Sequence, residues 1–145
     1  MEWAEYYIGM AKAASARSKD STKIGAVIVS PDHQIVSTGY NGFPRGYVDD
    51  YDIPREKKLK LTVHAEQNAI INAARHGISV NGCALYLSGL PPCHKCAAMI
   101  VNAGIVSVTY RNMIIPNRWA DSCDLARKIL RKCGVDVLVH LGGAG

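Results

Sequence analysis

Residues 83–111, CALYLSGLPPCHKCAAMIVNAGIVSVTYR, predict a strand, a helix and a second strand in succession. The two flanks, 83–88 and 105–111, are apolar and partly β-branched, which is typical of strands. The middle segment, 91–104, begins with two prolines and ends with a glycine, and these residues commonly mark the two ends of a helix. Strands that alternate with helices form a mainly parallel sheet, so this stretch indicates an α/β fold.

The rest of the chain continues the alternation. Further strands are predicted at 23–30, 34–40 and 135–139, the first two as an antiparallel hairpin. Further helices are predicted at 2–17, 64–77 and 118–133, with a short one near 54–60 in the long loop 41–61. We therefore expect a single domain over residues 1–145, built as three layers: a mixed five-stranded sheet with helices on both faces.

Helical spacing also predicts which side chains of two helices face the core. The apolar positions are Trp3, Tyr7, Met10 and Ala14 in the first helix, and Leu125, Ile129 and Cys133 in the last. Thr62 is a candidate cap for the helix near residue 64, and Asn117 is a candidate cap for the last helix.

The composition favours a cytoplasmic globular protein. Hydrophobic residues make up 48% of the chain and charged residues 20%, and the longest apolar runs are far too short to cross a bilayer. The start, MEWAEYY, lacks the pattern of a signal peptide, and five cysteines, an odd number, argue against a disulfide framework. The net charge of +5 favours anionic partners, among which is a small substrate that carries a phosphate.

Cys93, Cys96 and His64 form a candidate metal site. Two thiolates one helical turn apart can bind one ion, although thioredoxin-like redox motifs share this spacing. His64 favours metal, because it also lies at a predicted helix start, at the end of the sheet where ligands bind in open α/β sheets. Three protein ligands leave one tetrahedral position of Zn²⁺ open, as in catalytic sites. The other histidines in reach, His33, His76 and His94, are weaker ligand candidates.

Glu66 supplies the proton carrier that an open zinc site needs. Zinc lowers the pKa of a bound water toward ~7, and a nearby carboxylate can take the proton and pass it on. A glutamate in the first turn of a helix also interacts favourably with the helix dipole, which is the alternative explanation for Glu66 alone. Together with His64, Cys93 and Cys96, the carboxylate is expected to be catalytic. The remaining cysteines, Cys83, Cys123 and Cys133, are expected to be buried apolar residues.

His64-Ala65-Glu66 followed by Pro92-Cys93-His94-Lys95-Cys96 resembles the H-x-E…P-C-x-x-C signature of the zinc-dependent cytidine/deoxycytidylate deaminase superfamily. KIGAVIV (23–29), STGYNGFPRG (37–46), DD (49–50) and HAEQNAI (64–70) are similar to its deoxycytidylate (dCMP) deaminase branch. The likeness covers essentially the whole chain and implies the cytidine-deaminase-like fold, with one zinc per chain on His64, Cys93 and Cys96.

This resemblance implies an activity and a substrate site. Zinc-dependent hydrolysis would convert dCMP to dUMP and ammonia and so supply dUMP for thymidylate synthesis, with Glu66 carrying protons from water to the cytosine ring and the departing amine. Asn41 matches a residue that contacts the sugar, and the backbone at Ala65 and Ser88 matches positions that face the pyrimidine. Lys23 is our candidate for the 5′-phosphate, for which the alternatives are Arg45, Arg111 and Arg118.

The same resemblance implies regulation and assembly. Members of this branch are often hexamers, with dCTP and Mg²⁺ as activator and dTTP as inhibitor, and GYNGFPRGYVDD (39–50) resembles their effector-binding segment. A viral member would act in the cytoplasm of its host. The loop 41–61 contains no cysteine or histidine, so a second, structural zinc is not expected.

Other activities share parts of these motifs. A tRNA adenosine deaminase has the same zinc signature and a basic charge, and deaminases of other cytosine nucleosides or nucleotides are close alternatives. A deaminase acting on nucleic acid would use exposed aromatic residues beside a basic groove, and this chain has few aromatic residues and dispersed basic ones. A non-catalytic, zinc-binding scaffold with this fold would lack the glutamate, which is present here as Glu66.

Overall fold

The computed structural model describes residues 1–47, 53–111 and 114–141. Five helices and five strands follow one another along the chain as α1 (Trp3–Ser15), β1 (Gly25–Val29), β2 (Ile35–Tyr40), α2 (Arg55–Leu61), α3 (Ala65–Arg75), β3 (Ala84–Leu87), α4 (His94–Asn102), β4 (Ser107–Arg111), α5 (Asn117–Lys132) and β5 (Asp136–His140). This order agrees with the sequence prediction, including the short helix between β2 and α3. In the described ranges no helix has the length and apolar character needed to cross a membrane.

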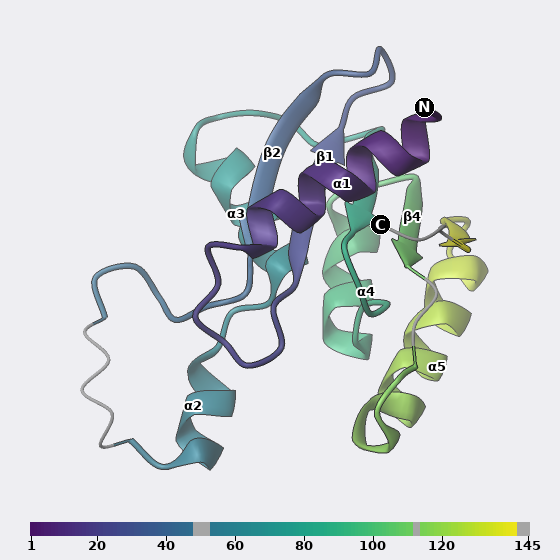
Figure 1. Cartoon of the computed structure of the whole chain (residues 1–145). Helices are drawn as coiled ribbons and strands as arrows, with labels where there is room; N and C mark the ends of the chain where they lie inside the picture. The colour runs from purple at the N-terminus through teal and green to yellow at the C-terminus, as the bar shows by residue number, and fades with distance from the viewer. Residues whose placement is uncertain (48–52, 112–113, 142–145) are drawn as a thin grey trace.

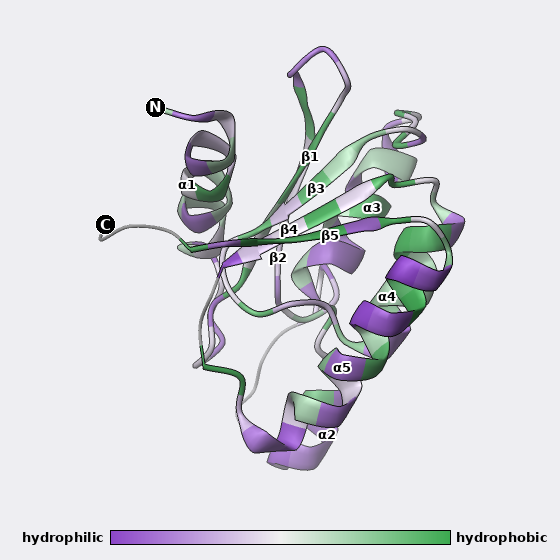
Figure 2. Cartoon of the chain, turned by 90° about the vertical axis from the view of Figure 1, so that its right-hand side faces the viewer, coloured by the Kyte–Doolittle hydropathy of each residue, from purple (hydrophilic) through white to green (hydrophobic). Residues whose placement is uncertain are grey.

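The five strands form one mixed sheet in the order β2-β1-β3-β4-β5. β1 is antiparallel to both β2 and β3, whereas β3, β4 and β5 run parallel. Figures 1 and 2 show α1 on one face of the sheet and α3, α4 and α5 on the other. The predicted three-layer α/β fold is confirmed, and α2 stands apart from these layers (Figure 1).

The main hydrophobic core lies between the sheet and the helices α3, α4 and α5. Its fully buried side chains include Ile28, Leu85, Ile100 and Leu130. A smaller core around Tyr7 and Val27 lies under α1. β1 is buried along its whole length because helices cover it on both faces, which explains its uninterrupted apolar sequence.

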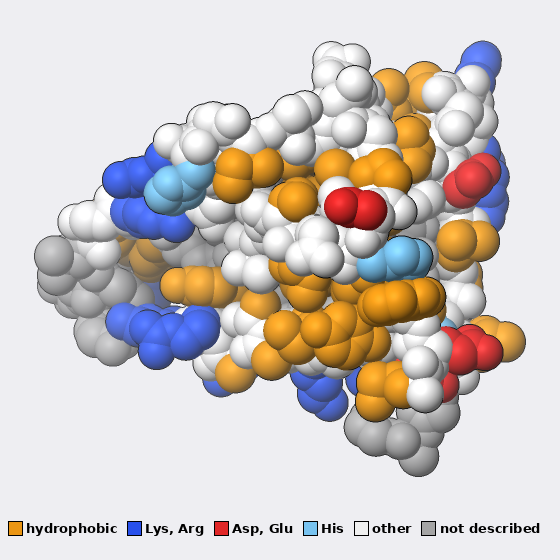
Figure 3. Space-filling view, turned by 90° about the horizontal axis from the view of Figure 1, so that it is seen from above, with side chains coloured by type: hydrophobic (Ala, Val, Ile, Leu, Met, Phe, Trp, Pro, Cys, Tyr) orange, Lys and Arg blue, Asp and Glu red, His pale blue; other side chains and the backbone are white. Residues whose placement is uncertain are grey.

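The predicted apolar face of α1 is wrong in part. Tyr7 is buried, but Trp3 is 54% and Met10 is 41% exposed, and the helix buries Ile8, Ala11 and Ser15 instead. The reason is the close approach of α1 to the sheet at Gly25, where a Cβ atom would lie 1.8 Å from the Ala11 carbonyl oxygen. Only small side chains fit between α1 and the sheet at that contact, so Trp3 and Met10 lie on the exposed side of the helix. Figure 3 shows hydrophobic side chains exposed on the face that is seen from above in the view of Figure 1.

The predicted apolar face of α5 is also wrong. Leu125 and Ile129 are exposed, and so is Cys133, which we expected to be buried. The side of α5 that packs inward carries Cys123, Ala126 and Leu130. As in α1, small side chains let this helix approach its neighbour α4 closely, and the alternative apolar row is left on the outside. Cys83 and Cys123 are buried as expected.

Gly39→Ala should destabilise the fold strongly. The added Cβ would lie 2.4 Å from the Ala69 nitrogen and 2.5 Å from the Ala65 oxygen, so α3 would have to move off the sheet. We expect a loss of about 1–3 kcal/mol or more of unfolding free energy, measured by urea denaturation. Gly9→Ala in α1 is the control, because no atom lies within 4 Å of its added Cβ. It should stabilise the helix by about 0.5–1 kcal/mol, and equal effects of both changes would contradict this packing.

Candidate active site

Three metal-binding side chains meet at the start of two helices. His64 is the residue before α3, Cys93 is the residue before α4, and Cys96 lies in the first turn of α4. His64 Nδ1 lies 3.2 Å from Cys96 Sγ and 3.6 Å from Cys93 Sγ, and the two sulfurs are 3.5 Å apart. These are the three residues that the sequence singled out as metal ligands.

Local hydrogen bonds and prolines fix these positions. The His64 N–H donates to Gln67 Oε1 at 2.9 Å, so His64 itself begins α3. Thr62, which we predicted as the cap of this helix, instead donates its hydroxyl to the Lys58 carbonyl at the end of α2. Ahead of α4, the buried Pro91 and Pro92 restrict the backbone that leads to Cys93.

The three donor atoms fit a zinc ion. With Zn–N of about 2.0–2.1 Å and Zn–S of about 2.3 Å, tetrahedral ligands lie about 3.6–3.8 Å apart. The distances found here, 3.2 to 3.6 Å, require shifts of only a few tenths of an ångström. In the described residues this is the one group of three or more His, Cys, Asp or Glu side chains whose ligand atoms converge, all within 4.8 Å.

The two thiols titrate as a coupled pair, with the pKa values of Cys93 and Cys96 shifted in opposite directions. A hydrogen bond with Cys96, and a weaker one with His64, lowers the pKa of Cys93 to about 3. The same contact with Cys93, together with burial, raises the pKa of Cys96. The pair therefore holds one thiolate and one thiol that share a proton. A divalent cation that replaces this proton would stabilise both thiolates.

Glu66 points its carboxyl into the same site. The side chain is only 5% exposed, and it lines the cavity in front of His64 and Cys93. Burial raises the pKa of Glu66, and the nearby His64 partly opposes this rise. A carboxyl group whose pKa moves toward neutrality exchanges protons readily, which suits a general acid and base.

The cavity in front of these residues has a volume of about 190 Å³. Its apolar lining residues include Ile24, Leu59, Leu90, Pro91, Pro116, Trp119 and Cys123. Its polar ones include Asp20, Ser21, Thr22, Asn41, Arg55, Thr62 and Arg118. Trp119 stands edge-on to the His64 ring, with ring centroids 6.3 Å apart. No motif in the sequence pointed to Trp119, although it lies in the first turn of α5, the helix that follows β4.

The predicted substrate residues occupy different positions relative to this cavity. Asn41 lines it and is buried, with its side chain bonded to the Ile24 N–H and the Thr22 carbonyl. Ala65 lines it as the first residue of α3, where backbone N–H groups have no partner inside the helix. Ser88 is not among the lining residues, and its hydroxyl accepts a hydrogen bond from the Gly25 N–H at 2.8 Å.

Of the four basic residues predicted as candidates for the 5′-phosphate, only Arg118 lines the cavity. Lys23 is exposed and is not among the lining residues of the cavity, and neither are Arg45 and Arg111. Arg45 donates to Asn72 Oδ1 at 2.7 Å. Arg118 does line the cavity, and so does Arg55, which we had not singled out. The signal for Arg55 was its place in the basic segment REKKLK (55–60), shortly before the H-x-E motif.

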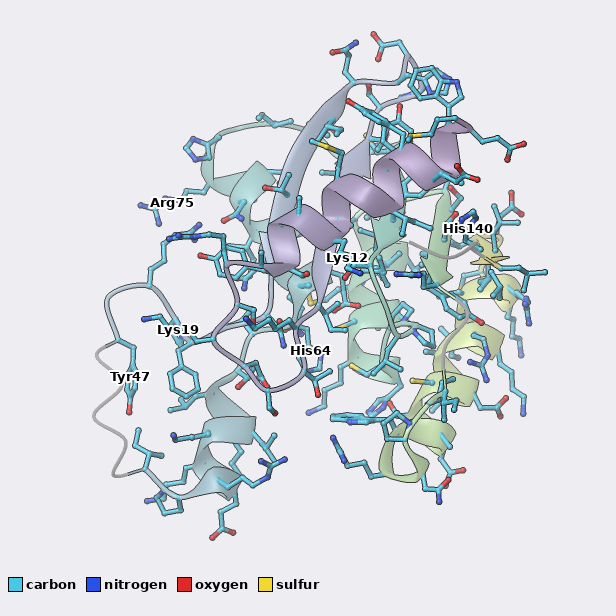
Figure 4. The ribbon with its side chains drawn as sticks, in the orientation of Figure 1. Lys12, Lys19, Tyr47, His64, Arg75 and His140 are labelled. Carbon is cyan, nitrogen blue, oxygen red and sulfur yellow. The ribbon has the colours of Figure 1, made fainter. Side chains whose placement is uncertain are left out.

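A second cavity of about 500 Å³ adjoins the first. Its lining includes four basic residues, Arg17, Lys19, Arg55 and Lys58, and three aromatic ones, Tyr40, Phe43 and Tyr47. Figure 4 shows Lys19 and Tyr47 on the α2 side of the molecule, with His64 between α2 and α5. Residues 40–44 and 47 of the predicted effector segment line this cavity, whereas 48–50 lie outside the described residues.

Comparisons with known proteins agree with this site. Residues 1–112 match the model of the cytidine and deoxycytidylate deaminase zinc-binding region. A deoxycytidylate deaminase of Homo sapiens is 36% identical over 93% of this chain and 78% of its own length. A probable deoxycytidylate deaminase of Drosophila melanogaster is 35% identical over 97% of this chain and 73% of its own length. The dCMP deaminase of the cyanophage S-TIM5, in complex with dCMP and dUMP, is 29% identical with a TM-score of 0.71, over 94% of this chain and 95% of that one.

Proposed function

Because this chain belongs to the cytidine and deoxycytidylate deaminase family, we propose that it converts dCMP to dUMP and ammonia by zinc-dependent hydrolysis. The observation that carries this proposal is the convergence of His64, Cys93 and Cys96 beside the buried Glu66, which lines the same cavity as His64 and Cys93. The test is a deamination assay of the zinc-loaded chain on dCMP, with cytidine, dCTP and a tRNA anticodon stem as competing substrates. We assign the whole of residues 1–145 to one deaminase domain.

Each residue of the site has a separate role in this proposal. His64, Cys93 and Cys96 would hold the zinc, which would make a water more acidic and more nucleophilic. Glu66 would accept a proton from the attacking water and pass it to N3 of cytosine while the water oxygen bonds to C4. It would then take the remaining proton of that oxygen and deliver it to the amine, which leaves C4 as ammonia. We expect the N–H groups at the start of α3, around Ala65, to donate hydrogen bonds to the pyrimidine. Asn41 holds the turn at 22–24 and presents its amide to the sugar.

The 5′-phosphate should bind Arg118 and Arg55 rather than Lys23. Both arginines line the catalytic cavity, and a guanidinium group can bind two phosphate oxygens at once. We expect Arg118→Ala to raise KM for dCMP about 10-fold or more, since a charge-assisted hydrogen bond contributes about 1.5–3 kcal/mol. The KM for deoxycytidine, which has no phosphate, should change little. Lys23→Ala is the matched control; a larger effect of Lys23→Ala than of Arg118→Ala would restore our original assignment.

The second cavity is our candidate for the effector site. Its four cations suit a triphosphate, and a base can stack on its aromatic side chains. We therefore extend the proposal to dCTP and dTTP as regulators, with Mg²⁺ bound by the phosphates of dCTP.

The exposed Leu125, Ile129 and Leu138 favour a homo-oligomer, for which a hexamer is our prediction. The five free cysteines suit the reducing cytoplasm, where we place the reaction.

A further inference from the structure

The start of α5 forms part of the catalytic cavity. Arg118, Trp119 and Cys123 of this helix line the cavity, and so does Pro116 just before it. Arg118 is exposed and Trp119 is half-buried, and the first buried side chain of the helix is Cys123, one turn later. Packing against the core therefore does not by itself hold Arg118 and Trp119 in place at the cavity.

Two hydrogen bonds to α4 fix α5 at this point. The half-buried Ser122 hydroxyl accepts a hydrogen bond from the His94 backbone N–H at 3.0 Å. The same hydroxyl oxygen lies 2.8 Å from Nδ1 of the His94 ring. Because the backbone N–H is the donor in the first bond, the hydroxyl hydrogen is left to donate to Nδ1. The hydroxyl thus uses both its donor and its acceptor capacity on one residue of α4.

The bond to the backbone takes the place of a helix cap. The first N–H groups of a helix have no partner inside it, and the side chain of the preceding residue often accepts a hydrogen bond from one of them. Cys93 precedes α4 and makes no such bond, and in our assignment its sulfur binds the zinc. Ser122 supplies the missing acceptor from α5. It therefore joins the zinc-binding turn of α4 to the turn of α5 that lines the cavity.

A neighbouring contact of α5 is weaker. The Cys123 thiol donates to the Pro91 carbonyl at 3.8 Å, and a thiol is a weak donor. Further along the helix, Ala126 and Leu130 are buried in the core. In the part of the chain that the structure describes, the bonds of Ser122 are therefore the main polar link between the start of α5 and the zinc-binding turn.

We infer that Ser122 is a positioning residue, which through His94 holds Arg118 and Trp119 at the catalytic cavity. The inference rests on the proposed function, in which Arg118 binds the 5′-phosphate of dCMP. Ser122 lies one helical turn after Arg118 and Trp119, so the three residues share one side of α5. Without the two bonds the start of α5 moves more freely, and the guanidinium spends less time in position for the phosphate. Substrate binding then weakens, while the zinc ligands and Glu66 keep their places.

Ser122→Ala should raise KM for dCMP about 5-fold, which corresponds to the net contribution of one hydrogen bond. The kcat and the zinc content should stay as in the parent protein, because the lost hydroxyl touches neither the metal ligand atoms nor the reacting atoms. Alanine is a better helix former than serine, so the change does not act by weakening α5 itself. Ser122→Thr, which keeps the hydroxyl, should restore most of the affinity.

The fluorescence of Trp119 gives a second measurement, which needs no substrate. The chain has two tryptophans, so Trp3→Phe leaves Trp119 as the only one. In this background Ser122→Ala should increase the quenching of Trp119 by acrylamide, measured with zinc bound. A purely local loss of stability elsewhere in the chain would not produce this change.

Two further variants serve as controls. Asp124→Ala removes ion pairs with Arg127 and Lys128 on the outer side of α5, and Asp124 lines neither cavity. It should change neither KM nor the quenching. His94→Ala removes only the ring bond, so it should raise KM less than Ser122→Ala does. Added to Ser122→Ala, it should cause no further rise, because both changes remove the same contact.

Three results would overturn the inference. The first is Ser122→Ala with the KM of the parent protein. The second is an equal rise in KM in Asp124→Ala. The third is loss of zinc from Ser122→Ala in parallel with activity, which would make Ser122 a support of the zinc-binding turn alone. A zinc-loaded parent protein that does not deaminate dCMP would contradict the proposed function instead. The quenching of Trp119 would then decide the inference, and equal quenching with and without Ser122→Ala would overturn it.

Discussion

Glu66→Gln should abolish nearly all turnover of dCMP while the protein keeps its zinc. The substitution preserves the size of the side chain and removes only its ability to take up and release a proton. A positioned general acid and base contributes about 10²–10⁴-fold to the rate, and Glu66 is expected to act in both proton transfers. We therefore expect kcat to fall by about 10³-fold or more, measured as ammonia release at saturating dCMP.

Zinc content and stability serve as controls for this variant. Glu66 is not a metal ligand in our assignment, so Glu66→Gln should hold one zinc per chain, measured by atomic absorption. The change also removes a buried ionisable group, so no loss of stability is expected. Glu5→Gln, in the first turn of α1, should retain full activity. Retention of near wild-type turnover by Glu66→Gln would remove the assigned role.

Cys96→Ala should lose zinc and activity together. Cys96 is fully buried, and its sulfur lies within 3.5 Å of both other ligand atoms. Changes to residues that merely support metal ligands already weaken metal affinity about 10–100-fold, so loss of a ligand should exceed about 100-fold. The deamination rate should fall in proportion to the zinc content, and added zinc should restore the rate only in part.

Cys83→Ala is the matched control for this loss. Cys83 is also buried, so the substitution removes a sulfur of the same size from the interior, but its position lies outside the catalytic cavity. We expect a modest loss of stability with full zinc content and full activity. If Cys96→Ala kept its zinc while Cys83→Ala lost it, the ligand assignment would be wrong.

The sequence predicted the fold well where its signals were local. Each strand and helix was located to within a few residues, because apolar periodicity and Gly or Pro punctuation mark elements independently of their neighbours. The faces of α1 and α5 were wrong because each helix carries two candidate apolar rows. Only the close approach at Gly25, or of α5 to α4, decides which row is buried, and that is a tertiary property.

In the candidate site too, residues with a local sequence pattern could be predicted, and residues that only the fold brings to the cavity could not. Cys93 and Cys96 could be predicted because two thiolates one helical turn apart can bind one metal ion, and His64 because it lies at the start of a second predicted helix. Trp119 could not, because it reaches the cavity from α5, far from His64 in the sequence, and carries no motif of its own. For Arg55 the only signal was its basic segment shortly before the H-x-E motif. Lys23 was chosen by resemblance, and only the three-dimensional arrangement shows that the cavity lining lacks it.

The most direct test of the account is hydrolysis of dCMP by the purified chain with one equivalent of zinc. We expect stoichiometric dUMP and ammonia, a clear preference for dCMP over cytidine and dCTP, and loss of the reaction when zinc is chelated. Equal or better turnover of an adenosine in a tRNA anticodon stem, or no turnover of any cytosine or adenine substrate by the zinc-loaded protein, would contradict it.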